Sequence, residues 1–402
     1  MNPIKKIYCR VFQICFRAAL PILPYREPKI LENMKALAAL LKEKEKNSIL
    51  IVTDKGISGL GLLEELTEAL KESGIAYHVY DDTVPNPTID NVEQARELYL
   101  QKGCGAIIGF GGGSSIDCAK VVGARIAKPA KPVHKMRGLL KICKKLPMLI
   151  AIPTTAGTGS ETTLAAVITD GDTHHKYPIN DFSLIPAYAV LDYQVTIGLP
   201  KHLTATTGMD ALTHAVEAYI GRSTTKFTRR MAEEAVILIK DNLKHAYDNG
   251  EDAEARKHML RAAYCAGIAF TRSYVGYVHG VAHSLGGQYG IPHGLANAVI
   301  LPYFLEEYGK SCEKKLGKLA RSCGIAEAGA SDEKASSDFI AWVKAMNHSM
   351  QIPKTLEGIR EEDIPKMAEH ADKESNPLYP VPKLMNAKEL EGMYRKVAGN
   401  LE

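Results

Sequence analysis

Short β-rich apolar segments alternate with longer segments of helical period over the first half of the chain. Residues 48–54 (SILIVTD), 76–82 (AYHVYDD) and 105–113 (GAIIGFGGG) have the composition of strands. Between them, residues 61–74 and 91–103 repeat apolar positions at the spacing of amphipathic helices. This alternation predicts a doubly wound, Rossmann-like parallel sheet.

The segments that follow continue the pattern. A helix is expected directly after the third strand, and MLIAIP (148–153) is typical of a further strand. We expect LAAVITD (164–170) and AYAVLD (187–192) to extend the same sheet, with Lys176 in the loop between them.

The pattern changes at about Leu199, beyond which helical periods follow one another to the C-terminus. We therefore predict two domains. Residues 1–198 form an α/β domain that begins with a helical extension over residues 1–47. Residues 199–402 form an all-helical domain, so the predicted fold class is α/β plus all-α.

The composition is that of an ordinary globular protein, with 402 residues of which 46% are hydrophobic and 24% charged. The formal net charge of +4 is small, and the basic residues are interleaved with acids, which excludes a nucleic-acid footprint. The eight cysteines form no CxxC pair, as expected of reduced thiols in a cytoplasmic protein. A cysteine-ligated zinc site is therefore not expected.

Residues 4–24 (IKKIYCRVFQICFRAALPILP) place basic residues among apolar ones and so resemble a targeting sequence. The apolar run is interrupted too often for a signal peptide, or for a spanning helix of about 20 apolar residues. A helix lying on a membrane surface is one alternative. We favour a helix packed on its own domain or on a partner subunit, and we expect no membrane span.

Distinctive polar residues and glycines follow three of the predicted strands. Asp54 and Asn86 come after the first two, and the third runs into FGGGSSIDCAK. In a parallel sheet such positions border a nucleotide crevice. The first turn, GISGLG, does not match the fingerprint G-x-G-x-x-G. Backbone N–H groups of Gly111, Gly112 and Gly113 could approach a pyrophosphate, with Ser114 and Ser115 opening the helix, although a tight turn with a serine N-cap explains this motif equally well.

A second polar loop, PTTAGTGSETT, follows the strand at residues 148–153 and is dense in hydroxyl groups. Thr154, Thr155 and Thr158 are candidates to line a ribose or a phosphate, and Lys176 is a further candidate contact. A solvated loop is the alternative. The position directly after a strand end favours contact with a ligand.

Three histidines, His279, His283 and His293, lie in the glycine-rich stretch at residues 276–294. His279 and His283 are four residues apart and share a helical face. We expect that helix to break before His293, because helix-breaking residues lie between them. These are Gly286, Gly287, Gly290 and Pro292.

Asp210 and His214 show the same four-residue spacing, which puts a carboxylate and an imidazole on one face of a second helix. Two such helices could enclose one cation. The alternative is that all these groups are scattered polar side chains that cap helix ends. Their grouping in two compact clusters favours the metal site.

The motifs FGGGSSIDCAK, PTTAGTGSE, GMDALTHAVEAY and VHGVAHSLGGQYGIPHGLANAVILP together resemble the iron-containing (group III) alcohol dehydrogenase family, which includes lactaldehyde reductase and butanol dehydrogenases. The similarity runs from about Ser48 to the C-terminus. It implies an NAD(P)-binding α/β half, a helical metal-binding half and a dehydroquinate synthase-like architecture. It also implies hydride transfer between NAD(H) and a small primary alcohol or aldehyde, by a homodimer. Many members begin with a strand that joins the dimer partner, whereas this chain begins helically.

The resemblance assigns the metal site as well. One ion, Fe(II) or in some members Zn(II), is implied to be held by Asp210, His214, His279 and His293. His283 is similar to a family histidine that lines the cleft without binding metal, and is the candidate for proton relay and hence for catalysis.

The cofactor contacts follow from the same resemblance. Asp54 is similar to the acid that contacts the adenosine ribose, which favours NAD over NADP because a carboxylate repels a 2'-phosphate. The other implied contacts are Asn86, Gly112, Gly113, Ser114, Thr154, Thr155, Thr158 and Lys176.

Two other functions compete with this one. A lyase resembling 3-dehydroquinate synthase would reduce and reoxidise NAD within one turnover, but it needs several basic residues near the metal. Arg272 is the one basic residue beside residues 279–293 that the sequence offers. A non-catalytic metal- or nucleotide-binding protein is the second alternative, which the intact ligand set disfavours.

Overall fold

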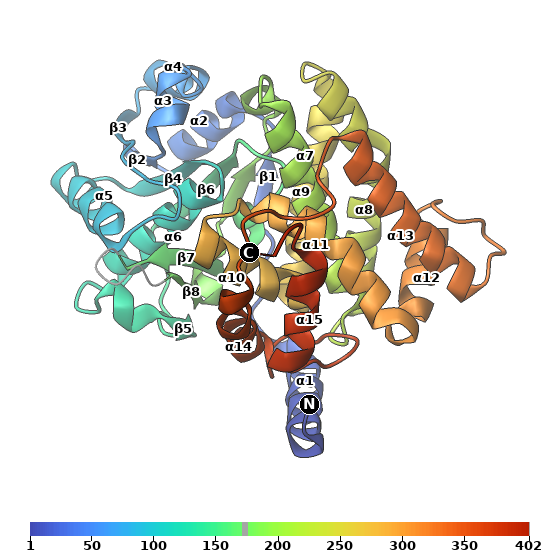
Figure 1. Ribbon diagram of the computed structural model, residues 1–402. Helices are drawn as coiled ribbons and strands as arrows, with labels where there is room; N and C mark the ends of the chain where they lie inside the picture. The colour runs from blue at the N-terminus through green and yellow to red at the C-terminus, as the bar shows by residue number, and fades with distance from the viewer. Residues whose placement is uncertain (171–175, 402) are drawn as a thin grey trace. The chain divides into compact units, whose positions relative to one another are not determined.

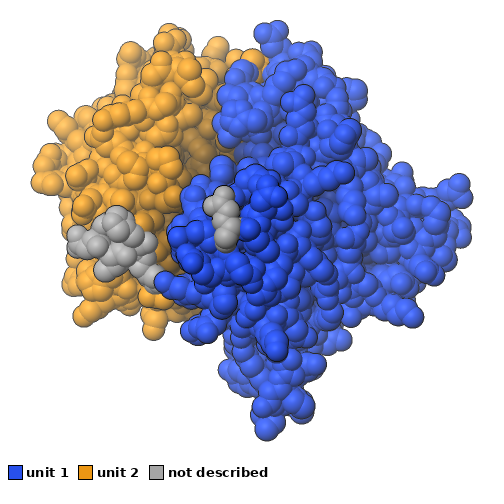
Figure 2. All heavy atoms as spheres, in the orientation of Figure 1, with its two compact units in different colours: residues 1–23, 198–402 blue, residues 24–197 orange. Residues whose placement is uncertain are grey.

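The computed structural model describes residues 1–170 and 176–401 (Figure 1). The chain divides into two compact units (Figure 2). One unit consists of residues 24–197, and the other combines residues 1–23 with residues 198–402.

The N-terminal helix α1 (Pro3–Ala19) belongs to the helical unit. This differs from the division expected from the sequence, which kept the N-terminus with the α/β domain. The physical reason is that side chains of α1 form polar contacts with residues near the C-terminal end of the chain. Arg10 and Gln13 of α1 donate hydrogen bonds to backbone carbonyls of residues 377–382.

The unit of residues 24–197 is built on a six-stranded sheet in which all neighbouring strands run parallel. In spatial order the strands are β1 (Lys29–Leu31), β9 (Tyr188–Val190), β6 (Met148–Pro153), β4 (Ala106–Gly111), β2 (Ser48–Val52) and β3 (Ala76–Tyr80). The chain passes from β2 outward to β3 and then returns to β4 on the other side of β2. The strand order therefore reverses between β2 and β4, where ligands of such sheets bind.

Helices cover both faces of this sheet because alternate residues of its strands point to opposite sides. In β2, Leu50 packs into one apolar core and Ile49 into the other. The covering helices are α5 (Ile89–Gln101) and α6 (Gly113–Ala127) on the first side, and α2 (Met34–Glu43) and α4 (Glu64–Glu72) on the second. This arrangement confirms the predicted doubly wound fold.

The segment LAAVITD does not extend the main sheet, so that expectation was wrong. It forms β7 (Ala165–Thr169), which pairs antiparallel with β8 (Lys176–Asn180) in a separate three-stranded sheet with β5 (Gly138–Leu139). Lys176 thus begins a strand and does not lie in a loop. Burial alternates residue by residue along β7 and β8, as in a sheet with one solvated face, whereas β4 is buried throughout.

The predicted helical extension over residues 1–47 also needs a correction. It contains the edge strand β1, which pairs with β9. Because β1 has only three residues and two of them are exposed, its sequence carries little strand signal.

The second unit is helical, as predicted. Over the described residues from 198 onward, the structure contains helices and one isolated bridge between Leu356 and Ala398. The helices are α7 (Lys201–Ile220), α8 (Lys226–Asp248), α9 (Ala253–Ser273), α10 (Tyr277–Tyr289), α11 (His293–Tyr308), α12 (Glu313–Ser322), α13 (Asp332–Ser349), α14 (Ile364–Ser375) and α15 (Ala387–Val397). None of the helices in the described part of the chain has the length and apolar content to cross a membrane.

Helix α10 ends later than the glycines suggested. It continues through Gly286 and Gly287 and stops at Gly290, which adopts a left-handed conformation with φ of 69°. A glycine inside a helix costs only about 1 kcal/mol, so neighbouring packing overrides it, whereas a left-handed residue ends the helix. Pro292 then precedes α11, so His293 is its first residue.

Candidate functional site

Asp210, His214, His279 and His293 converge within the helical unit. The first two come from α7, and the others from α10 and from the first residue of α11. Each residue offers one ligand atom, and the four atoms all lie within 4.8 Å of one another. Asp210 Oδ1 lies 3.8 Å from His279 Nε2 and 3.5 Å from His293 Nε2. We call these residues the metal quartet.

Two glycines allow helices to pack closely beside the metal quartet, one between α11 and α7 and the other between α10 and α14. A Cβ on Gly294, next to His293, would lie 2.6 Å from the carbonyl oxygen of Thr206 on α7. A Cβ on Gly280, next to His279, would lie 2.4 Å from Ser375 Oγ on α14. Both distances are too short for a real side chain, so each histidine is followed by the one residue that permits this packing.

His279 is oriented by a buried carboxylate. Its Nδ1 lies 2.7 Å from Glu217 Oε2, and the two oxygens of Glu217 also accept the backbone N–H groups of Gly276 and Val278. Burial acts to raise the pKa of Glu217, and these N–H donors oppose that rise because they favour the carboxylate form. With Nδ1 donating to Glu217, the lone pair of His279 is on Nε2, which faces the metal quartet.

The environment of His279 fits a metal ligand. Its Nε2 is buried and has no hydrogen-bond partner among the described residues. Burial, followed by the neighbouring imidazoles, holds the pKa of His279 well below 6.5, so the ring is neutral. A neutral, oriented imidazole with an unshared lone pair is the form that binds a divalent cation. The metal quartet therefore offers one carboxylate and three imidazoles to an ion.

Replacing Glu217 with Gln is expected to weaken metal binding by roughly 10–100-fold, the usual cost of losing a partner that orients a ligand. The amide is similar in size but no longer offers two acceptor oxygens to three N–H donors. Competition with a chromophoric chelator measures the affinity. Glu233→Gln is the matched control, because Glu233 accepts a hydrogen bond from Tyr219 on α7 outside the quartet. An unchanged affinity in Glu217→Gln would contradict this role.

Asn297 supports the quartet from α11. Its buried Nδ2 donates to Asp210 Oδ1 at 2.7 Å and lies 3.0 Å from His293 Nε2. Sequence reasoning missed both Asn297 and Glu217. Helical spacing could have identified both residues, because Asn297 lies four residues after His293 and Glu217 lies seven after Asp210.

His283 lies beside the quartet but is not part of it. Its ring stacks on His293 with centroids 5.2 Å apart, and its Nδ1 lies 2.6 Å from Glu374 Oε1. The Tyr379 hydroxyl donates to the same Glu374 oxygen at 2.7 Å. Burial acts to raise the pKa of Glu374, but attraction to His283 and these two hydrogen bonds outweigh it and hold the pKa below its ordinary value.

Most of the predicted nucleotide contacts follow β2, β4 and β6 in the other unit, whereas Asn86 follows β3 and Lys176 is the first residue of β8. Asp54 follows β2, caps the short helix α3 (Lys55–Gly59), and accepts a hydrogen bond from Ser115 Oγ at 3.2 Å. Ser114 Oγ accepts the N–H group of Asn86 at 3.3 Å, and Lys176 Nζ donates to Asn86 Oδ1 at 2.6 Å.

The glycine turn and the hydroxyl loop face each other at the same edge. A Cβ on Gly113 would lie 3.2 Å from Thr158, and one on Gly112 would lie 3.9 Å from Thr155 Oγ1. The Thr154 N–H group donates to the carbonyl of Gly111 at 3.1 Å. The structure thus brings all the predicted contact residues to one edge of the sheet.

The start of α6 is suited to an anion. Gly112 occupies the N-cap position, and no side chain in the described part of the chain caps this helix. Its first N–H groups and the positive end of its dipole are therefore available to a phosphate. The alternative of a serine N-cap is wrong, because Ser114 lies inside the helix and not at its cap.

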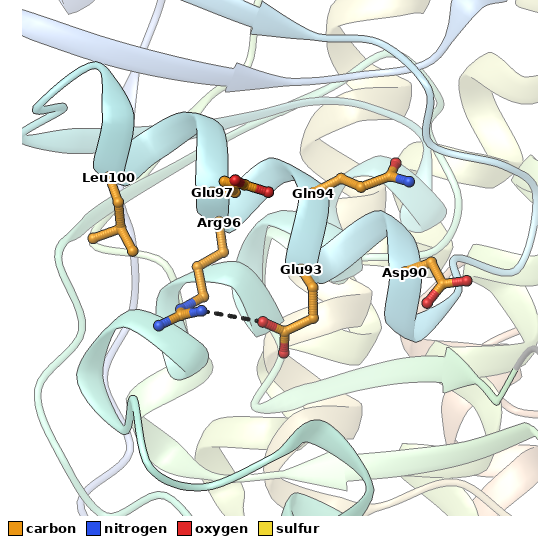
Figure 3. Close-up of a pocket in the computed structure, with 6 residues that line it drawn as sticks. All are labelled: Asp90, Glu93, Gln94, Arg96, Glu97 and Leu100. Carbon is orange, nitrogen blue, oxygen red and sulfur yellow. Dashed lines mark hydrogen bonds and ion pairs between the residues drawn. The ribbon is translucent and has the colours of Figure 1, made fainter.

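A separate hollow of about 410 Å³ lies on α5 (Figure 3). Its lining comes from that one helix, where Arg96 forms an ion pair with Glu93 at 3.3 Å. Because groups from different elements do not converge there, this hollow has none of the features of the two sites above.

Two family models match the chain. The model "Iron-containing alcohol dehydrogenase" covers residues 29–193, and "Fe-containing alcohol dehydrogenase family, C-terminal" covers residues 204–398. Residues 1–28 lie outside both matches.

Known proteins are similar over most of this length. Alcohol dehydrogenase 4 of Schizosaccharomyces pombe is 40% identical over 339 residues, which is 82% of this chain and 79% of that protein. The crystal structure of 1,3-propanediol oxidoreductase superposes with a TM-score of 0.88 at 34% identity, covering 93% of this chain and 99% of the other. Sulfoacetaldehyde reductase from Bifidobacterium kashiwanohense, solved in complex with NAD+, gives a TM-score of 0.83 at 25% identity, covering 93% and 98%.

Proposed function

Because this chain belongs to the iron-containing alcohol dehydrogenase family and is an oxidoreductase, we propose that it transfers a hydride between NAD(H) and a small primary alcohol or aldehyde. The observation that carries the proposal is the metal quartet, whose four ligand atoms lie within 4.8 Å of one another. The family matches favour this reaction over the lyase and the non-catalytic alternatives.

We propose that Asp210, His214, His279 and His293 hold one Fe(II), with Zn(II) as the alternative. Four protein ligands exceed the three that are usual for catalytic zinc, which favours iron. When bound, such an ion supplies Lewis acidity that stabilises negative charge on the substrate oxygen. Glu217 and Asn297 keep the ligand side chains in position.

His283 is the proposed proton relay. Its Nδ1 is held by Glu374, which is itself fixed by Tyr379. Nε2 is therefore the nitrogen left to exchange the proton that accompanies hydride transfer. The ordinary pKa of histidine lies near neutrality, which suits this exchange in both directions.

NAD(H) is the proposed cofactor. The uncapped start of α6 offers N–H groups to the pyrophosphate, and Asp54 offers a carboxylate to the ribose. The complex of sulfoacetaldehyde reductase with NAD+ supports a nicotinamide cofactor in a protein of this fold.

A cytoplasmic homodimer is proposed as the working form. All eight cysteines are free thiols, which is typical of a reducing compartment. The family resemblance supports the dimer.

The proposal is tested by incubating the metal-loaded protein with NADH and a panel of short aldehydes while NADH absorbance is followed. At least one small aldehyde should be reduced to its primary alcohol. If no aldehyde oxidised NADH, and a phosphorylated dehydroquinate-type substrate instead released phosphate, the lyase function would replace this one.

His283→Ala should keep its metal and lose turnover by roughly 10²–10⁴-fold, the usual contribution of a positioned acid–base group. The pH dependence of kcat should flatten as well, because the group that takes up the proton is gone. Metal content, measured on the same sample, separates the possible roles. Loss of metal in this variant would make His283 a ligand and not a relay.

A further inference from the structure

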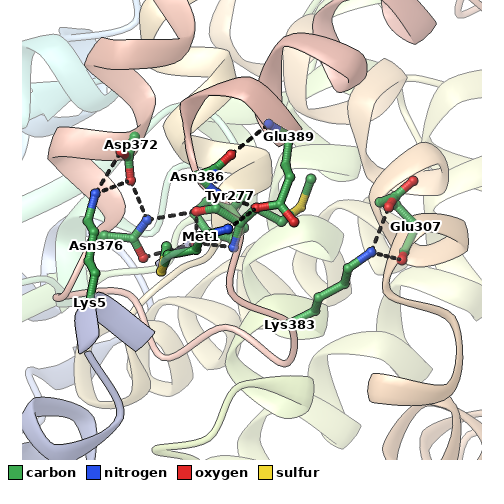
Figure 4. Close-up of polar contacts among 10 residues, drawn as sticks. Met1, Lys5, Tyr277, Glu307, Asp372, Asn376, Lys383, Asn386 and Glu389 are labelled. Atoms are coloured by element: carbon green, nitrogen blue, oxygen red, sulfur yellow. Dashed lines mark hydrogen bonds and ion pairs between the residues drawn. The ribbon is translucent and has the colours of Figure 1, made fainter. Parts of the chain in front are cut away.

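Helix α1 is attached to its unit by its polar face. Arg10 donates hydrogen bonds to the carbonyls of Val381 and Pro382, and the buried Gln13 donates to those of Pro377 and Tyr379. Near the start of the helix, Lys5 forms an ion pair with Asp372 on α14 at 2.8 Å (Figure 4). These contacts fix which side of α1 faces the protein.

The opposite side of α1 is apolar and uncovered. Five large side chains spaced three or four residues apart form one stripe, the apolar stripe, and over half of each is exposed. They are Ile4 (77%), Ile7 (66%), Tyr8 (58%), Val11 (52%) and Ile14 (66%). In Figure 1, the ribbon of α1 extends beyond α14 and α15 of its own unit.

This orientation reverses the usual arrangement of a surface helix. Such a helix normally turns its apolar side to the core and its polar side to water. In α1 the side packed against the protein carries Arg10 and the buried Gln13 along with Cys9 and Phe16, and the apolar stripe faces outward. A contiguous exposed apolar surface of this kind marks an interaction site.

The segment that carries the apolar stripe has charged side chains of one sign. Residues 1–26 contain five basic residues and no Asp or Glu. Lys6 and Arg17 are also exposed on α1. Burial, followed by repulsion from Arg17, Arg222 and Arg229, lowers the pKa of Lys315 to about 8, so cations also accumulate behind the helix. A partner for this surface must combine apolar groups with negative charge.

We propose that α1 docks on the surface of a bilayer that contains anionic phospholipids. The apolar stripe would enter the boundary between head groups and acyl chains, while Lys6 and Arg17 contact the lipid phosphates. The proposal concerns a helix that lies on the membrane and does not cross it. It is independent of the catalytic proposal, because α1 precedes the first residue of both family matches.

A second copy of the chain fits this surface less well. A stable protein interface uses about 20–30 residues on each side, whereas the apolar stripe offers five. Pairing two stripes would also bring together two sets of like charges, which is unfavourable. An anionic bilayer neutralises those charges.

Flotation of the full-length protein with vesicles tests the proposal. The protein should float with vesicles that contain phosphatidylglycerol and stay behind with pure phosphatidylcholine, and added salt should weaken the binding. Ile7→Asp/Val11→Asp should lower the partition coefficient by about a hundredfold, because two apolar side chains no longer enter the lipid. The matched control, Leu100→Asp/Ile237→Asp, changes exposed apolar residues on α5 and α8 and should float like the wild type.

Light scattering of the same samples tests whether a second copy of the chain binds the apolar stripe instead. If the wild type failed to float and Ile7→Asp/Val11→Asp halved its mass, the stripe would be an interface between copies and the membrane proposal would be overturned. It would also be overturned if the variant floated as well as the wild type. Thermal unfolding of each variant shows that any lost binding comes from a folded protein.

Discussion

His279→Ala is expected to lose bound metal and turnover together, with kcat/KM lower by more than about a hundredfold. The loss of an orienting partner alone costs roughly 10–100-fold, and removal of the ligand itself should cost more. His279 is buried, its Nε2 faces Asp210 Oδ1 at 3.8 Å, and its Nδ1 is held by Glu217. A water molecule in the space left by alanine would lack that orientation. Metal analysis and NADH-dependent activity on one preparation give the result.

His245→Ala serves as the control for this experiment. His245 is exposed near the end of α8 and is remote in sequence from every ligand, so its loss should change neither metal content nor rate. Full metal and full activity in His279→Ala would show that the metal quartet is not the site.

Asp54→Gly is expected to shift the cofactor preference toward NADP(H). A carboxylate and one phosphate charge 4 Å apart at an effective dielectric constant near 20 repel by about 4 kcal/mol before relaxation. Lys55 does not neutralise Asp54 fully, because its ammonium group pairs with Asp82 at 2.7 Å. After screening by solvent, we expect the wild type to prefer NADH by roughly ten- to a thousandfold, and the variant to lose most of that preference.

The comparison uses the ratio of kcat/KM for NADH to that for NADPH, with one aldehyde. The ratio is used because Asp54 also caps α3 through the N–H group of Ile57. Replacing that cap with glycine costs roughly a few tenths of a kcal/mol of stability whichever cofactor is bound. Asp54→Asn separates the two effects, since the amide can still cap the helix but carries no charge. A wild type that prefers NADPH, or unchanged ratios in both variants, would show that another residue reads the 2' position.

Local spacing was enough to predict the strands of the main sheet other than β1 and to group the candidate ligands in two clusters, and the family resemblance then selected the members of the metal quartet. Asp210 and His214 share a face because four residues make about one helical turn, and strand ends meet at one edge in any parallel sheet. Glu374 could not be predicted in this way. It lies 91 residues from His283, and only the packing of α10 against α14 brings the two together.

The wrong assignment of β7 to the main sheet has a different cause. Its residues have the composition of a strand, and the sequence predicted one there. Which sheet a strand joins depends on its pairing partner, and β7 pairs antiparallel with β8. Ala166 and Ile168 are buried whereas Val167 between them is partly exposed, as expected of an antiparallel pair with one solvated face.

Helix α1 shows a further limit of sequence patterns. Its period indicates which residues share a side, but not which side faces the protein. The sequence favoured packing on its own domain or on a partner subunit, and the structure adds that the side packed on its own unit is the one that carries Arg10 and Gln13.

The central claim is that the metal quartet makes this chain a metal-dependent aldehyde reductase. The most direct test is the rate of NADH oxidation with one short aldehyde after the metal has been removed by a chelator and then restored. We expect activity to be lost with the metal, and to return when about one Fe(II) per chain is bound at the four ligands, with Zn(II) restoring less. Full activity in protein shown to contain no metal would contradict the account.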